Sequence, residues 1–176
     1  MNKRGLSRML SVLLLVVMVV SMLPVSAYAE GATAALVTDL SSLAAGDKVV
    51  IVAKDFDFAL GTTQNKNNRE AVAVTKAGTN ITVTETVQVL TLGAGTKEGT
   101  FAFNTGSGYL YAASSGKNYL KTEAALSDNS SWTVDISADG VATLKAQGAN
   151  TRNWLRYNPN NGTPLFSCYA SGQNDI

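Results

Sequence analysis

The stretch WTVDISADGVATL, residues 132–144, decides the fold class of this chain. Apolar or β-branched side chains alternate with polar ones through 132–136, as on a strand with one buried face, and residues 141–144 form a second β-run. Between these runs, Asp139 and Gly140 form an Asp-Gly pair, which is a strong signal for a tight hairpin turn. The stretch therefore predicts two antiparallel strands joined by a short turn.

Similar strands recur along most of the chain. Three prolines and 15 glycines, with many Thr, Val, Ser and Asn residues, describe short strands joined by tight turns. Helical periodicity is weak: only residues 36–43 predict a helical turn, with Asp39 or Ser41 as its cap. Short strands at this spacing predict an all-β sandwich or barrel. The predicted strands are residues 48–53, 71–75, 80–84, 87–92, 100–103, 109–111, 132–136 and 141–144.

A weak internal repeat narrows the architecture. Three stretches that begin at Gly46, Gly99 and Gly140 share one order of features: a β-run, a turn, an apolar pair, a polar loop and a closing β-run. Threefold repetition of four-strand units predicts a β-trefoil-like barrel of three imperfect repeats. Because no single residue repeats strictly, an irregular β-barrel or a sandwich is the fallback.

The third repeat differs from the other two at its end. It has no closing β-run, because the sequence stops at residues 174–176, where the other copies continue into a strand. A barrel without its last strand has an open edge that can pair with another chain. We expect either a C-terminally truncated product or a last strand contributed by a neighbouring chain.

The N-terminal residues predict a secretory signal peptide at 1–29. Lys3, Arg4 and Arg8 precede an apolar stretch at 9–23, and the small-residue site at 27–29 follows Pro24. A membrane anchor is the alternative, but a spanning helix needs about 20 apolar residues and this run is shorter. Cleavage after Ala29 would leave residues 30–176 as a single all-β domain that is secreted, extracellular or associated with the cell surface.

Composition limits the chemistry of that domain. With 14 Lys and Arg against 13 Asp and Glu, nothing favours nucleic acid as a partner. Histidine is absent, so neither a serine nor Cys168 has the usual general base to activate it. Asp55 and Asp57 point the same way on one strand and so cannot flank a scissile bond from opposite sides. No calcium-binding loop motif is present either. We expect no enzyme activity, no cofactor and no metal.

Two loops rich in Asn and Arg are the candidate ligand-binding site. Amides and guanidinium groups beside an aromatic face are suited to binding sugar hydroxyls, and residues 64–69 and 150–161 bring these groups together. The alternative is structural, because Asn suits left-handed turn positions and Arg can bridge loop carbonyls. We expect a non-catalytic module that binds polysaccharide or cell-surface glycan, or else a spacer or protein-interaction domain. The candidate residues are Asn68, Arg69, Arg152, Trp154, Arg156, Tyr157 and Asn158.

Three further predictions concern the core. Trp132 begins an alternating strand and is expected to be buried. Cys168 lies between apolar neighbours and is expected to be a buried small side chain, although a thiol that pairs between chains is the alternative. Tyr109 and Tyr111 share one face, and we expect that face to be the inner one; if Leu110 is core instead, both tyrosines face outward.

Several motifs follow one another in a fixed order: residues 36–38 with 45–52, 59–62 with 67–69, 108–114 with 118–120, 155–158 and 165–169. In this order they resemble an accessory module found in large secreted or surface proteins of gut and soil bacteria. Such modules sit beside extracellular nuclease or phosphoesterase domains. The resemblance covers nearly all of residues 30–176 but implies no settled activity. In that pattern one more strand follows the final Gly-Gln segment, and the stop at Ile176 departs from it.

Overall fold

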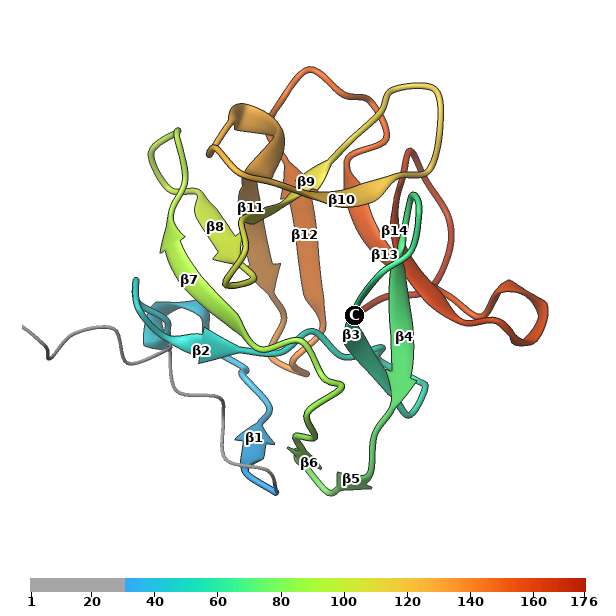
Figure 1. The fold of residues 1–176 in the computed structure, drawn as a ribbon. Helices are drawn as coiled ribbons and strands as arrows, with labels where there is room; N and C mark the ends of the chain where they lie inside the picture. Colours follow the sequence, from blue (N-terminus) through green and yellow to red (C-terminus); the bar gives the residue numbers. More distant parts are fainter. Residues whose placement is uncertain (1–30) are drawn as a thin grey trace, which may run out of the picture.

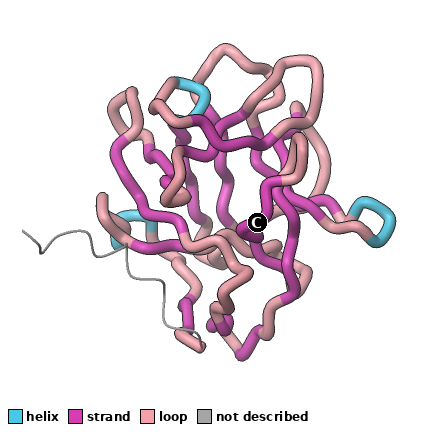
Figure 2. Tube along the Cα trace, viewed as in Figure 1, coloured by secondary structure: helices cyan, strands magenta, loops and turns pink. Residues whose placement is uncertain are grey.

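The computed structural model describes residues 31–176, and the predicted signal peptide with its cleavage site lies outside the described residues. The described chain is all-β, as predicted, with fourteen antiparallel strands in two sheets and three short 3₁₀ turns (Figures 1 and 2). None of its helices is long and apolar enough to cross a membrane.

The larger sheet holds eleven strands. Its neighbours follow the order β10-β9-β8-β11-β12-β13-β14-β4-β3, and β7 pairs with both β8 and β2 (Figure 1). No ladder joins β2 to β12, and the described strands do not close into a barrel. The strands are β2 (Lys48–Val49), β3 (Phe58–Gln64), β4 (Arg69–Ala73), β7 (Leu90–Ala94), β8 (Phe101–Asn104), β9 (Tyr109–Ala112), β10 (Leu120–Glu123), β11 (Ser131–Ile136), β12 (Ala142–Ala146), β13 (Trp154–Asn158) and β14 (Leu165–Tyr169).

The hairpin predicted from residues 132–144 is confirmed. Strands β11 and β12 pair antiparallel from Trp132 opposite Ala146 to Ile136 opposite Ala142. The turn between them places Gly140 at a φ of 77°, which is a left-handed conformation that glycine adopts without steric cost. This explains why the Asp-Gly pair is a good local signal here.

A second, smaller sheet lies against one side of the larger one. It consists of β1 (Thr33–Ala35), β6 (Asn80–Thr82) and β5 (Lys76–Ala77), in the order β1-β6-β5, and it appears at the bottom of Figure 1. The 3₁₀ turn η1 (Leu40–Ser42) follows β1, and Asp39 caps it by accepting a 2.8 Å hydrogen bond from the Ser41 amide. This confirms the helical turn predicted within 36–43. The other two turns are η2 (Asp128–Ser130) and η3 (Asn160–Gly162).

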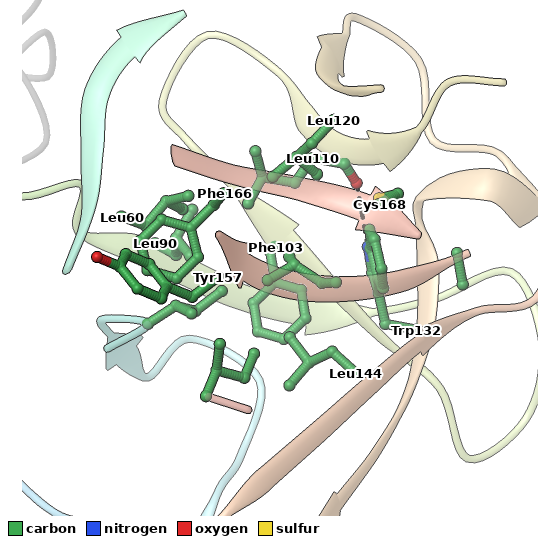
Figure 3. Packing of buried hydrophobic residues seen from close by; sticks show 14 of the residues in the cluster. Leu60, Leu90, Phe103, Leu110, Leu120, Trp132, Leu144, Tyr157, Phe166 and Cys168 are labelled. Carbon is green, nitrogen blue, oxygen red and sulfur yellow. Dashed lines mark hydrogen bonds between the residues drawn. The ribbon is translucent and has the colours of Figure 1, made fainter. Parts of the chain in front are cut away.

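The main core is a cluster of buried side chains that come mostly from the strands of the larger sheet (Figure 3). Trp132 and Cys168 are both fully buried, as predicted, and Cys168 is a free thiol. The Trp132 indole extends towards β9, where its Nε1 donates to the Leu110 carbonyl. A second cluster, between the two sheets, consists of Ala59, Val74, Ile81, Val83 and Val87.

The prediction that Tyr109 and Tyr111 face the core is wrong. Leu110 is fully buried and both tyrosines are only partly buried, so the β9 alternation has the opposite sense to the one expected. Leu110 belongs to the main core together with Trp132, whose indole donates to the Leu110 carbonyl, and strand alternation then directs both tyrosines away from that core. Burial and the nearby Glu123 carboxylate raise the pKa of Tyr111 above its ordinary value.

The last three residues return to the larger sheet. Asn174 forms an isolated antiparallel bridge with Tyr157, and the carbonyl of Asp175 accepts a hydrogen bond from the Lys54 amide. The carbonyl of Ile176 accepts one from Ala142, and its side chain is 5% exposed within the main core. Residues 174–176 therefore lie between the β12 edge and the segment that follows β2.

Candidate functional site

Strand β13 presents three of the predicted site residues on one face. Side chains alternate along a strand, so Trp154, Arg156 and Asn158 point away from the core, and Leu155 and Tyr157 point into it. The burial pattern follows this alternation, with Leu155 and Tyr157 buried and the other three partly exposed. The outward face of β13 is therefore where the predicted residues come together.

Two cations lie over the Trp154 indole ring. The Lys145 Nζ atom is 4.8 Å from the ring centroid, and the Arg156 guanidinium carbon is 5.5 Å from it. Lys145 reaches the ring because it is the cross-strand partner of Trp154, and Arg156 because it is two residues further along the same face. Cations within about 6 Å of an indole centroid are attracted by the ring's quadrupole.

A carboxylate completes this group. The Arg156 Nη1 donates a 2.6 Å hydrogen bond to the Asp175 Oδ1 within a salt bridge, in which the Arg156 side chain is 17% exposed and that of Asp175 is 49% exposed. We call Lys145, Trp154, Arg156 and Asp175 the Trp154 cluster. It combines an aromatic ring, charged donors and an acceptor on a surface strand.

Arg69 does not belong to that cluster, which corrects the prediction that it contacts ligand. It is 3% exposed, and its guanidinium donates to the Thr62 carbonyl at 2.8 Å, the Gln88 Oε1 at 3.2 Å and the Thr122 Oγ1 at 2.7 Å. Burial lowers the pKa of Arg69 below its ordinary value. The residue joins β4 to neighbouring segments, which is the structural role that the sequence left open as an alternative.

Tyr157 is likewise a core residue. It is 1% exposed, and its ring packs against Phe56 and Phe166 with centroids 4.9 Å and 5.4 Å away. Desolvation raises the pKa of its hydroxyl. Tyr157 is therefore not available to stack on a ligand. Asn158 is on the outer face, but its Nδ2 is engaged with the Tyr169 hydroxyl at 2.8 Å.

Asn68 and Arg152 stabilise loops. The Asn68 amide lies 3.0 Å from the Ser167 Oγ, and that hydroxyl also donates to the Asn118 carbonyl at 2.6 Å. The Arg152 Nη1 donates to the Asn118 Oδ1 at 2.7 Å. The loop around Asn118 is thus bonded to Ser167 on β14, which also contacts Asn68, and to Arg152 just before β13. Of the seven predicted residues, Trp154 and Arg156 lie together in the Trp154 cluster, and the other five lie outside it.

Sequence reasoning missed Lys145 and Asp175. Lys145 lies on a different strand from Trp154, and only the β12–β13 register brings the two together. Asp175 is nineteen positions from Arg156 and reaches it because residues 174–176 return to β13. No local pattern signals either contact. A lysine and an aromatic on adjacent strands of a predicted hairpin would be the nearest usable signal.

A cavity of about 770 Å³ lies elsewhere in the fold, between the β2 segment and the start of β12. It is lined by residues of both strand edges, by inward side chains of the larger sheet and by residues of the small sheet. We call it the β2–β12 groove. Its inner apolar lining includes Phe101, Phe103, Val134, Ile136, Leu144 and Ile176.

Side chains that could bind a metal ion do not cluster in the described part of the chain. No group of three or more His, Cys, Asp or Glu residues there is placed to hold a metal ion. Asp55 and Asp57 are both exposed, and Asp57 lies 3.8 Å from the Lys76 ammonium. Desolvation raises the pKa of the buried Cys168 thiol, which opposes formation of the thiolate.

Comparison with known proteins identifies no family for this chain and one remote structural similarity. Neither a protein family nor a curated protein matches the chain. One solved structure, the Haemophilus ducreyi cytolethal distending toxin, is similar over 72% of this chain and 78% of its own, with 12% sequence identity and a TM-score of 0.48. A likeness this remote carries no argument about the function of this chain.

Proposed function

We propose that residues 30–176 form a non-catalytic, secreted binding module that recognises polysaccharide or cell-surface glycan through the Trp154 cluster. The observation that carries the proposal is the partly exposed Trp154 ring with Lys145 and Arg156 over it and Asp175 beside them. A ring of this size on a surface strand is suited to stacking against the apolar face of a sugar.

The polar groups around the ring suit sugar hydroxyls. Lys145 and Arg156 are hydrogen-bond donors and Asp175 is an acceptor. The cluster can therefore donate to the oxygen of a sugar hydroxyl and accept from its hydrogen. The ring and both cations lie on adjacent strands of one sheet, which limits the entropy lost on binding. A binding site of this kind needs no nucleophile, general base or metal.

The trefoil-like arrangement is part of the proposal. Strands β2, β7, β8, β11 and β12 follow one another as hydrogen-bonded neighbours. The hairpins β3–β4, β9–β10 and β13–β14 fall one within each sequence repeat, which supports three related four-strand units. In this arrangement the Trp154 cluster belongs to the third unit. We also propose that the module is an accessory domain of a larger surface protein that contains other domains.

The test is a binding screen of purified residues 30–176 against glycans and bacterial cell-wall polymers. Circular dichroism first establishes that the protein is folded. We expect a saturable ligand whose affinity falls at least tenfold in Trp154→Ala and in Arg156→Ala, roughly the loss of one stacked ring or one charged hydrogen bond.

The matched control for that screen is Tyr119→Ala. Tyr119 is also partly buried and has a lysine, Lys121, 5.1 Å from its ring centroid, but it lies outside the Trp154 cluster. Binding should be unchanged in this variant. A folded protein that binds none of the polymers, or one that binds equally well without Trp154, would contradict the proposal.

A second candidate function is a protein-interaction domain, and the β2–β12 groove favours it. An apolar groove bordered by two unpaired strand edges is suited to an extended peptide rather than to a sugar.

A further inference from the structure

We propose that the Trp154 cluster selects acidic glycans, with the Lys145 ammonium as the partner of a uronic-acid carboxylate. This inference rests on the proposed glycan binding by the cluster and names the class of glycan that it takes. Three observations carry it: the Lys145 ammonium forms no salt bridge within residues 31–176, it lies over the indole ring, and the sheet face beside it is polar and partly exposed.

The charge of Lys145 is not neutralised by the described part of the chain. Acidic side chains there form salt bridges with Lys76, Lys97 and Arg156, but not with Lys145. The Lys145 Nζ atom lies instead 4.8 Å from the centroid of the Trp154 ring. Attraction to the ring leaves the N–H donors of the ammonium without an acceptor atom. Lys145 therefore offers a ligand both a charge and unused hydrogen-bond donors.

The cluster is positive on a domain that is negative overall. Lys145 and Arg156 contribute two positive charges and Asp175 one negative charge, which leaves +1 (2 − 1). Residues 30–176 hold 11 Lys and Arg, the 14 of the sequence less the three at 1–29, against 13 Asp and Glu, which gives −2 (11 − 13). The domain as a whole therefore does not attract anions, and an acidic glycan has to be recognised by a local positive site.

The position of Lys145 over the ring determines what a sugar has to provide. A sugar that stacks on this face of the Trp154 indole displaces the ammonium from it. A neutral sugar gives the displaced charge only hydroxyl groups, which are weaker partners than a carboxylate. A uronic acid has an apolar ring face for the indole and a carboxylate on the same ring for the ammonium. The cluster therefore distinguishes sugars of the same shape by their charge.

Arg156 is not the cation that binds the carboxylate. Its Nη1 atom already donates a 2.6 Å hydrogen bond to the Asp175 Oδ1, and its side chain is only 17% exposed. A ligand carboxylate placed beside Arg156 would also meet the like charge of Asp175, which is unfavourable. The carboxylate is therefore directed to the Lys145 side of the ring, and the Arg156–Asp175 pair faces the sugar hydroxyls.

The sheet register gives the direction in which a longer glycan extends. On one side of Trp154, Lys145 is its cross-strand partner on β12, and Thr133 on β11 is in turn opposite Lys145. Thr133 is partly exposed, and its hydroxyl can both donate and accept. On the other side Trp154 is opposite Tyr169, which is 6% exposed and offers little surface. Asp135, also on the outer face of β11, is exposed and forms no salt bridge with Lys145. The glycan therefore runs across the strands from Trp154 over Lys145 to Thr133.

The experiment compares uronic-acid oligosaccharides with their own methyl esters, which keep the sugar backbone and lack the charge. Oligomers of galacturonate, glucuronate and mannuronate are titrated into folded residues 30–176 by calorimetry. We expect at least one of them to bind about tenfold or more tightly than its ester, and added salt to weaken only the charged form. Lys145→Gln should abolish this preference, and Lys145→Arg should retain it. The matched control is Lys121→Gln, which removes a lysine that lies 5.1 Å from the Tyr119 ring centroid, outside the cluster, and should leave the preference unchanged.

The possible results separate this inference from the proposed function. Equal affinity for every uronate and its methyl ester would overturn selection by charge and leave glycan binding in place. A preference that persists in folded Lys145→Gln would overturn the role of Lys145. Tighter binding of a sulfated oligosaccharide than of any uronate would overturn the carboxylate as the recognised group. Failure of folded protein to bind any glycan, charged or neutral, would overturn the proposed function itself and this inference with it.

Discussion

The Trp132 indole Nε1 donates a 3.0 Å hydrogen bond to the Leu110 backbone carbonyl, and both residues are fully buried. The bond connects β11 to β9, which are not paired in the sheet. The Phe103 ring on β8 packs edge-on against the same indole, with centroids 6.3 Å apart. One side chain therefore holds three strands of the larger sheet together, and its polar atom is satisfied inside the core.

Replacing Trp132 with phenylalanine should lower the free energy of unfolding by about 2–4 kcal/mol. The change removes ring volume from a filled core and leaves the Leu110 carbonyl buried without its donor. Urea denaturation followed by circular dichroism measures the effect. The control is Trp154→Phe on the surface strand β13, which should cost about 1 kcal/mol or less. Equal losses in the two variants would contradict the assigned role of Trp132.

Arg69→Lys should destabilise the protein by about 1–3 kcal/mol. Lysine keeps the charge but cannot present the planar fork that reaches Thr62, Gln88 and Thr122 together, so buried acceptors lose their partners. Thermal unfolding compared with Arg156→Lys, at a partly exposed ion pair worth about 0–1 kcal/mol, checks this. A stable Arg69→Lys protein with weakened glycan binding would return Arg69 to the ligand site.

Cys168 should be inert in the folded protein. Burial raises the pKa of its thiol, so very little thiolate forms, and the side chain is closed to solvent. Labelling with iodoacetamide at pH 8 should be at least a hundredfold slower in native protein than in 6 M urea. Rapid labelling of Cys168 in the native protein, or a disulfide-linked dimer that dithiothreitol dissociates, would contradict the buried position.

The same thiol predicts how stability depends on pH. Its pKa is higher in the folded state than in the unfolded chain, so its contribution is complete below the unfolded pKa and is lost as pH rises towards the folded one. Above pH ~9 the wild-type protein should therefore lose stability faster than Cys168→Ala, by up to ~1.4 kcal/mol per pH unit. Urea midpoints between pH 7 and pH 10.5 test this, and parallel curves would contradict it.

Gly108→Ala should lower stability by at least ~2 kcal/mol. Gly108 has a φ of 149°, and a Cβ atom there would lie 2.4 Å from the Glu123 carbonyl oxygen, so both backbone strain and collision oppose the substitution. Gly116→Ala is the matched control, because nothing lies within 4 Å of its Cβ position and its φ is not in the left-handed region. Similar stabilities of the two variants would contradict this reading of the β9–β10 hairpin.

Part of the fold follows from sequence alone because its causes are local. The β11–β12 hairpin depends on alternation over a few residues and on an Asp-Gly turn, and the η1 cap depends on Asp39 two residues before Ser41. Burial of Trp132 was predicted from its place in an alternating strand, and burial of Cys168 from its apolar neighbours in the sequence. Each of these features is determined by residues that are close together along the chain.

The tertiary structure decided the rest. Alternation places Trp154 and Tyr157 on opposite faces of β13, but which face is inner depends on the strands packed against it. The same holds for β9: its alternation does not reveal which face is the inner one, and in the structure Leu110 is buried and Tyr109 and Tyr111 lie on the outer face. The buried position of Arg69 depends on acceptors from three segments that are distant in the sequence. Lys145 lies beside Trp154 because of the register between β12 and β13, and Asp175 reaches Arg156 because residues 174–176 return to β13. The sequence by itself determined the all-β class and the hairpins, because local periodicity and turn chemistry carry them. Only the tertiary structure decided the composition of the site and the open groove, because both depend on contacts between segments far apart in the chain.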